Sequence, residues 1–266
     1  MLRKIIKNAY LSFILLFTYV PILVMVVLSF NSSKSRVNFT GFSLKWYQQM
    51  FSDRNIVSAL QNTILIALLS SIIAVIIGTM AAVAISNMSR RKRTIYMSIT
   101  NIPMLNADVV TGISLMLCFI VLGKAIPFFS SLSFKTVLIS HITFNLPYVI
   151  LSVLPKLKGA SQLEYQAARD LGATSSQAFF KVVLPEIMPG VVSGAILAFT
   201  LSLDDVVISY FTAGPGSNTL PLYIYSMIKT GITPDVNALT TIMLTITFIT
   251  LTSIAVIQSR KIRKRI

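Results

Sequence analysis

The stretch Gln166-Ala167-Ala168-Arg169-Asp170-Leu171-Gly172 decides how the rest of the chain is interpreted, because it is a polar segment lying between long hydrophobic runs. Ser161 and Glu164 have the spacing of a capping box, in which two side chains bond unpaired backbone amides at a helix start. Gly172 can adopt the left-handed conformation that a helix C-terminus often needs. The sequence therefore predicts a short helix that begins at Ser161 and is stopped by Gly172.

The segment after Gly172 predicts a second short helix. Thr174 and Gln177 offer another capping box. Apolar residues then follow at near-helical spacing, namely Phe179, Phe180, Val182 and Val183. Pro185 is expected to end this run, because proline has no backbone amide to donate. We interpret residues 161–185 as a loop through which the chain docks onto a partner protein; an ordinary amphipathic helical hairpin is the alternative.

The composition indicates a polytopic membrane protein. The chain has 266 residues, of which 55% are hydrophobic and only 12% charged, and its mean hydropathy is +0.78. The net charge of +15 does not favour nucleic-acid binding, because the basic residues form short clusters between apolar runs instead of one solvated face. The single cysteine, Cys118, cannot form an intramolecular disulfide and is expected to be a packed side chain.

Six hydrophobic runs are long enough to cross a bilayer as helices, which takes roughly 20 residues each. They are residues 9–30, 57–86, 95–123, 132–155, 187–213 and 237–258. With both termini in the cytoplasm, 16 of the 23 basic residues lie on the inner side, as the positive-inside rule requires. We therefore expect an all-α fold with six transmembrane helices, forming a single permease domain over residues 1–266 with the 161–185 loop in the cytoplasm.

The third run contains polar residues that are costly in hydrocarbon. An ionisable group at membrane depth costs about 2.5–3.5 kcal/mol on insertion scales, so Asp108 must face protein or water. Asn101, Asp108 and Thr111 share one face of a continuous helix, at spacings of seven and three. We expect this face to line an internal pathway. Alternatively, Asp108 is protonated or caps a helix that breaks at Pro103.

The fourth run carries a polar stripe at helical spacing, formed by His141, Asn145, Tyr148 and Ser152. This stripe is expected to face the interior of the helix bundle and to contribute to the same pathway. No metal site is predicted, because the chain has one histidine and no ligand spacing typical of a metal centre. A hydrogen-bonded packing role is the favoured interpretation of His141 itself.

The fifth run combines small residues with two acids. Gly190 and Gly194 would allow the backbone of another helix to approach closely. Asp204 and Asp205 lie further along, and on a continuous helix they point about 100° apart, so only one can face a given groove. Asp205 is preferred over Asp204 for the pathway. Because the runs hold almost no Lys or Arg, we hypothesise that the missing positive charge is the substrate.

Two segments between runs are expected on the outer side. Residues 31–55 carry Trp46, Tyr47 and Phe51, which predict an amphipathic piece at the membrane surface where a soluble partner or the lipid interface itself would hold it. Residues 220–229 predict a second amphipathic piece.

No catalytic motif or cofactor-binding motif is recognisable, so the chain is not expected to be an enzyme or to hold a cofactor. Energy for transport must then come from another subunit or from an ion gradient. The two classes to be separated are a subunit of an ATP-driven importer and a proton-coupled secondary transporter using Asp108, Asp204 and His141. The docking loop and the absence of visible inverted repeats weigh against the second class.

The loop resembles the EAA loop of ABC-importer membrane subunits, written E-A-A-x3-G-x9-I-x-L-P, through which a permease docks on its ATPase. The matching residues are Ala167, Ala168, Gly172, Leu184 and Pro185, with Val182 in place of Ile. Gln166 stands where the pattern has Glu, and Glu164 lies two positions early. The resemblance implies that Glu164, Gln166 and the matching residues contact an ATPase.

Longer runs resemble the PotC-type permeases of spermidine/putrescine ABC importers. They include Ser140–Phe144, Phe199–Val207, Leu220–Met227 and Pro234–Leu239. The resemblance implies a type I importer permease (MetI-like) fold in the cytoplasmic membrane, a PotB-like second permease, two PotA-like ATPases and a PotD-like binding protein. It also implies that Asp108, Asp204 and Asp205 help to guide polyamines. A type I permease for another small solute is the alternative within this class.

Overall fold

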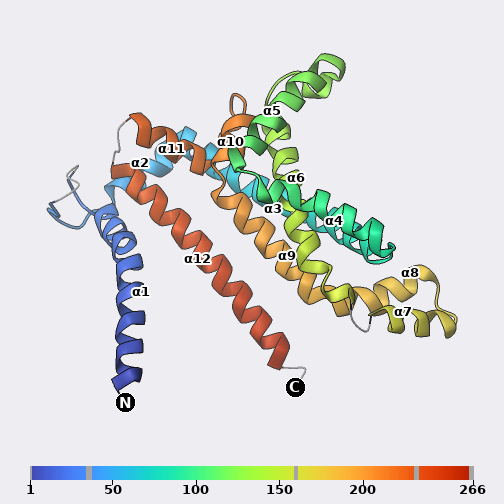
Figure 1. The fold of residues 1–266 in the computed structure, drawn as a ribbon. Coiled ribbons are helices and arrows are strands. Elements are labelled where there is room, and N and C mark those ends of the chain that lie inside the picture. Colours follow the sequence, from blue (N-terminus) through green and yellow to red (C-terminus); the bar gives the residue numbers. More distant parts are fainter. Residues whose placement is uncertain (1, 34–37, 159–160, 231–233, 264–266) are drawn as a thin grey trace. The chain divides into compact units, whose positions relative to one another are not determined.

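The computed structural model describes residues 2–33, 38–158, 161–230 and 234–263, and within them the protein is almost entirely helical (Figure 1). The α-helices are α1 (Leu2–Ser29), α2 (Lys45–Ser52), α3 (Arg54–Ser86), α4 (Arg90–Leu105), α5 (Asp108–Ala125), α6 (Phe134–Val153), α7 (Ser161–Asp170), α8 (Ser175–Ala178), α9 (Leu184–Asp204), α10 (Val207–Thr212), α11 (Leu220–Thr230) and α12 (Pro234–Arg263). Short 3-10 turns, η1 (Pro127–Phe129) and η2 (Lys156–Lys158), and one π-helical segment, η3 (Phe179–Val183), connect some of them. The all-α prediction is confirmed.

Five described helical segments are long and apolar enough to cross a membrane. They are Lys7–Ser29, Arg54–Ser86, Asp108–Ala125, Phe134–Val153 and Ser175–Asp204. In α12 the described apolar part is the shorter segment Val236–Thr250. The expectation of several membrane-spanning helices is therefore met, and the count of six stays a prediction.

Two of the expected continuous spans are broken, contrary to the sequence-based expectation. Residues 95–123 are divided between α4 and α5, and the break lies at Asn106 and Ala107 instead of Pro103. Residues 187–213 are divided between α9 and α10, because Asp205 leaves the helical conformation with φ −65° and ψ 125°. The continuous-helix geometry assumed for Asn101 with Asp108, and for Asp204 with Asp205, was wrong.

The chain forms two compact units, Met1–Val57 with Tyr223–Ile266, and Ser58–Leu222. In the first unit, α12 contacts both α1 and α2. Trp46 of α2 is only 3% exposed, and its indole nitrogen donates a hydrogen bond of 2.6 Å to the carbonyl of Asn31. The amphipathic helix is present, with the Trp46 ring buried in the unit's interior and Phe51 60% exposed. Its expected place at the membrane surface stays a prediction.

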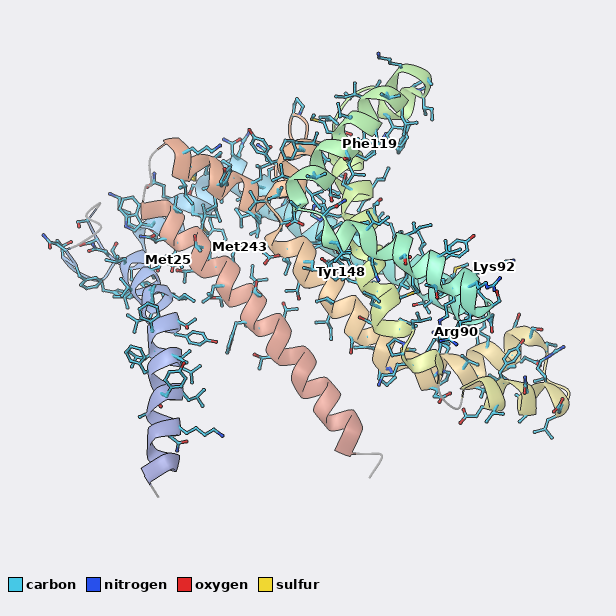
Figure 2. All side chains as sticks on the ribbon, viewed as in Figure 1. Met25, Arg90, Lys92, Phe119, Tyr148 and Met243 are labelled. Atoms are coloured by element: carbon cyan, nitrogen blue, oxygen red, sulfur yellow. The ribbon has the colours of Figure 1, made fainter. Side chains whose placement is uncertain are left out.

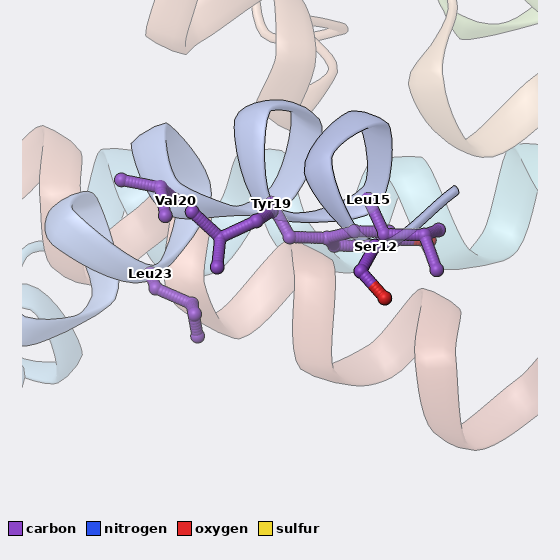
Figure 3. Close-up of a pocket in the computed structure, with 6 residues that line it drawn as sticks. Ser12, Leu15, Tyr19, Val20 and Leu23 are labelled. Carbon is purple, nitrogen blue, oxygen red and sulfur yellow. The ribbon is translucent and has the colours of Figure 1, made fainter. Parts of the chain in front are cut away.

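Helix α1 is largely apolar, and its residues 7–21 are all exposed. It holds a shallow open pocket lined by Ser12, Leu15, Leu16, Tyr19, Val20 and Leu23 (Figure 3). Side chains of this kind are compatible with hydrocarbon, since lipid tails are as apolar as leucine.

The second unit is built around α6, which packs closely on α9. A Cβ atom added to Gly190 would lie 2.7 Å from the carbonyl oxygen of Ser152, and one added to Gly194 would lie 3.3 Å from the Cα of Val149. On α3, a Cβ at Gly78 would lie 2.7 Å from a methyl group of Val149. The prediction of close backbone approach at Gly190 and Gly194 is confirmed, and α6 is held between two glycine-lined surfaces.

A side chain at Gly190 should therefore separate α6 from α9. We expect Gly190→Val to destabilise the protein by about 1–3 kcal/mol, the usual cost of overpacking a tight contact. Thermal unfolding of the purified protein in detergent measures this. Ser193→Val is the matched control, because Ser193 lies on the exposed face of the same helix; equal loss of stability in both variants would contradict the close contact.

Candidate functional site

The loop after α6 has the two-helix form expected from its sequence. α7 begins at Ser161 and ends at Asp170, and Gly172 has φ +87°. The amide of Ala173 bonds the carbonyl of Ala168 at 3.0 Å, and the amide of Gly172 bonds that of Arg169 at 3.0 Å. This pair of bonds is the Schellman motif, which satisfies carbonyls at a helix end. Gly172 therefore stops α7, as predicted; the Ser161 capping box falls on a side chain outside the described set.

The second part of the loop confirms one prediction and corrects another. Thr174 and Gln177 form the predicted capping box, with bonds of 3.3 Å and 3.0 Å between side chains and backbone amides. Pro185, however, does not end the run, because η3 continues directly into α9 and places Pro185 in the first turn of that helix. Pro185 therefore stands where the π-helical segment passes into α9, and the chain stays helical through it.

The loop exposes apolar side chains, two of them before the apolar segment Ser175–Asp204 and one, Phe180, in its first turns. Leu171 is 89% exposed, Leu163 is 73% exposed and Phe180 is 64% exposed. Of the residues predicted to dock, Glu164, Gln166, Ala167, Gly172 and Pro185 are exposed, and Ala168 and Leu184 are half-buried. The loop is internally anchored by Ala178 and Val183, which are buried. Exposed apolar side chains on an ordered helical loop are compatible with a protein-binding surface.

A second candidate site is a buried polar cluster along the stripe of α6. His141 and Asn145 are 1% and 0% exposed, which confirms that this part of the stripe faces the interior. Asn145 donates a 2.8 Å hydrogen bond to the hydroxyl of Ser202 on α9, which lies 3.0 Å from the hydroxyl of Ser70 on α3. Three helices therefore meet at one hydrogen-bonded junction.

The cluster extends to the break between α9 and α10. His141 Nε2 lies 3.1 Å from the hydroxyl of Ser209 and 3.5 Å from Oδ2 of Asp205. Asp205 also accepts hydrogen bonds from the backbone amides of Ile208, at 3.2 Å, and Ser209, at 2.8 Å. The predicted hydrogen-bonded packing role of His141 is confirmed, and its carboxylate partner is Asp205.

The remaining predicted pathway residues are less buried. Asp108 and Asp204 are exposed, and Asp108 lies in the first turn of α5 at the break after α4. Tyr148 on α6 (Figure 2) is half-buried, with its ring centroid 5.4 Å from that of Phe144. Asn101 lies on α4 and not on the helix of Asp108. The acids are thus divided between one enclosed carboxylate and two open ones.

Sequence reasoning missed the serines that complete the cluster, namely Ser70, Ser202 and Ser209. Each lies in an apolar run, where a hydroxyl can also bond the carbonyl one turn earlier in its own helix. Ser202 stands two residues before Asp204, and Ser209 stands four residues after Asp205. Their proximity to the acids was the available signal. Among the described residues, no group of three or more His, Cys, Asp or Glu could hold a metal ion.

The helical fold agrees with what comparison with known proteins shows. Residues 74–266 match the family model described as "Binding-protein-dependent transport system inner membrane component". The chain belongs to this family. It is 37% identical over 249 residues to the spermidine/putrescine transport system permease protein PotC of Escherichia coli strain K12, covering 94% of this chain and 92% of that protein.

Other relatives and solved structures agree. The putrescine transport system permease protein PotI of Escherichia coli strain K12 is 37% identical over 229 residues, covering 86% of this chain and 82% of that protein. A bacterial ABC transporter involved in the import of the acidic polysaccharide alginate contains a chain with a TM-score of 0.75 at 17% identity, covering 97% of this chain and 98% of its own. The fold is therefore that of an ABC-importer permease, and the protein is a multi-pass inner-membrane component of such a transporter.

The three-helix junction should contribute measurably to stability. We expect Ser202→Ala to destabilise the protein by about 1–3 kcal/mol, because Asn145 then keeps a buried amide donor without its acceptor. Thermal unfolding in detergent measures the loss. Ser193→Ala is the control, since that exposed hydroxyl bonds only the carbonyl of Pro189 in its own helix. A loss no larger than that of the control would show that the junction does not stabilise the fold.

Proposed function

We propose that this protein is the permease subunit through which an ABC importer moves spermidine or putrescine into the cytoplasm. The observation that carries the polyamine assignment is the 37% identity, over 94% of the chain, to a spermidine/putrescine permease. The partners of the complex are a second, PotB-like permease, two PotA-like ATPases and a PotD-like binding protein. ATP hydrolysis belongs to the ATPases, and this chain is the conduit.

The charge distribution supports a cationic solute. Asp108, Asp204 and Asp205 lie in or at the ends of membrane-spanning segments, where an isolated carboxylate is costly. Lys and Arg lie mainly outside these segments, as Arg90 and Lys92 do at the start of α4 (Figure 2). A passing polyamine offers ammonium groups that pair with carboxylates. We place the substrate path along these acids, with His141, Asn145 and Tyr148 on the adjacent face of α6.

The loop supplies a mechanical connection between ATPase and path. η3 continues into α9, and α9 runs without interruption from Leu184 to Asp204. A helix of 21 residues is about 30 Å long, so it reaches across the hydrocarbon core. Movement of the docked loop therefore displaces the acids at the far end of the same helix. We propose that Glu164, Gln166, Ala167, Ala168, Gly172, Leu184 and Pro185 form or flank the ATPase contact.

The orientation follows from the basic residues. Arg90 to Arg93 stand at the start of α4, and Arg169 and Lys181 stand in the docking loop. Placing these clusters in the cytoplasm, with both chain termini, satisfies the positive-inside rule. The loop then faces the compartment that contains ATP.

Transport in sealed vesicles tests the proposed function. The complete complex is reconstituted with the binding protein outside and ATP inside, and uptake of radiolabelled spermidine and putrescine is measured. We expect ATP-dependent uptake of at least one polyamine and none with a proton gradient alone. A complex with a hydrolysis-deficient ATPase is the control. Uptake driven by the proton gradient without ATP would indicate a secondary transporter, and ATP-driven uptake of another solute that polyamines do not inhibit would indicate a different substrate.

The docking surface makes a separate prediction. Leu171→Glu and Phe180→Glu should each abolish copurification of the ATPase, because a charge would be buried in an apolar interface. Both side chains are largely exposed, so the permease itself should fold and keep its thermal stability. Gln48→Glu, which adds the same charge at an exposed position of α2, is the control. Normal ATPase recovery with both loop variants would contradict docking through this patch.

A further inference from the structure

The two adjacent acids at the end of α9 have different surroundings. α9 ends at Asp204, Asp205 is extended, and α10 begins at Val207. The side chain of Asp205 is only 9% exposed, whereas Asp204 is an exposed residue. A single helical break thus encloses one carboxylate and leaves its neighbour open.

Both oxygens of Asp205 are already engaged by the protein. Oδ1 accepts from the amide of Ile208 at 3.2 Å, and Oδ2 accepts from the amide of Ser209 at 2.8 Å. The first amides of a helix have no intrahelical partner, and a carboxylate there is also favoured by the helix dipole. Asp205 therefore caps α10, and contact with a solute would require it to release these amides.

His141 adds a connection from a different helix. Its side chain is 1% exposed, and Nε2 stands 3.5 Å from Oδ2 of Asp205 and 3.1 Å from the hydroxyl of Ser209. With a hydrogen on Nε2, the imidazole donates toward both groups. Because α6 is closely packed on α9 through Gly190 and Gly194, His141 is held on a rigid support. The position of the break is consequently tied to α6.

The carboxylate of Asp204 is not held in this way. In the part of the chain that the structure describes, its carboxylate forms no side-chain hydrogen bond or ion pair with another residue. Asp205 is the adjacent residue, and two neighbouring carboxylates repel each other, so a cation approaching Asp204 reduces this repulsion. Asp204 is the carboxylate of the pair that is free to bind.

We propose that Asp205 and His141 are a positioning pair that holds the α9–α10 break, and that Asp204 is the carboxylate that contacts an ammonium group of the solute. This inference rests on the proposed function, and it reverses the preference for Asp205 that a continuous helix implied. The solute class recognised at Asp204 is a flexible aliphatic cation carrying primary ammonium groups.

The two roles predict opposite responses to the removal of charge. Asparagine at position 205 keeps one carbonyl oxygen that can accept from a backbone amide, and asparagine is a good capping residue. Asp205→Asn should therefore retain uptake within about twofold of wild type, while Asp205→Ala, which removes the cap, lowers both uptake and stability. Asp204→Asn should lower uptake by roughly tenfold, the effect of losing one charge-assisted hydrogen bond, without changing the midpoint of thermal unfolding.

The experiment measures ATP-driven uptake of spermidine and the thermal midpoint of the complete reconstituted complex for Asp204→Asn, Asp205→Asn, Asp205→Ala and His141→Ala. The double variant Asp205→Ala with His141→Ala should lose less stability than the sum of its parts, because the two residues form one interaction. Asp53→Ala is the matched control, because Asp53 accepts a hydrogen bond from the amide of Asn55 near the start of α3. The stability lost in Asp53→Ala should simply add to the stability lost in His141→Ala.

Two results would overturn the proposal. One is wild-type uptake in Asp204→Asn. The other is an uptake loss in Asp205→Asn as large as that in Asp204→Asn, with an unchanged thermal midpoint, which would mean that Asp205 acts through its charge on the solute. If Asp205→Ala fails to assemble, the positioning role is supported, and Asp205→Asn still decides between the roles. The measurement of the thermal midpoint requires no solute. If the complex transported something other than a polyamine, the proposed function would be overturned, but the pairing of Asp205 with His141 could still be tested by this measurement.

Discussion

The capping of α10 by Asp205 is the interaction on which the transport region depends. A helix that breaks inside a membrane leaves backbone amides that no water in the hydrocarbon can satisfy, and each costs several kcal/mol if left unpaired. Asp205 satisfies two of these amides, and His141 keeps its carboxylate paired. The break is therefore stable because the acid that causes it also supplies its hydrogen bonds.

The glycine-lined contact between α6 and α9 holds this interaction in a fixed geometry. Gly190 and Gly194 bring the two backbones together below the break, and Asn145 and Ser202 join them by a hydrogen bond closer to it. A pair such as His141 and Asp205 is effective only if its members are held at fixed separation. Since η3 continues directly into α9, a displacement of the 161–185 loop, where the ATPase is proposed to dock, would act on the break through a stiff element.

Local chemistry was predictable from the sequence, and the helix breaks were not. Thr174, Gln177 and Gly172 determine the loop through their own backbone bonds, and Gly190 and Gly194 identify a close contact by their lack of a side chain. The breaks at Asn106 and at Asp205 lie within runs that are apolar on both sides. Asp205 accepts from the amides of Ile208 and Ser209, three and four residues ahead, but hydropathy alone does not distinguish such a local cap from a polar residue inside a continuous helix. The prediction that Pro185 ends a helix was wrong for a related reason. A proline that could stop one helix is equally suited to the first turn of the next. The burial of Trp46 was not predictable, because an aromatic ring with one polar atom suits an interface and a hydrogen-bonded interior alike.

The division of roles between the acids limits what this chain can do for a polyamine by itself. With Asp205 bonded to α10 and His141, the open carboxylates on the proposed substrate path are Asp204, at the end of α9, and Asp108, at the start of α5. A polyamine leaves water only where its ammonium groups find partners, because an unpaired charge in a low-dielectric passage is strongly disfavoured. Two open carboxylates can balance the two ends of a diamine, whereas a triamine needs a further acid. The second permease of the complex is the natural source of that acid, so the preference between putrescine and spermidine within the membrane is a property of the paired permeases and not of this chain alone.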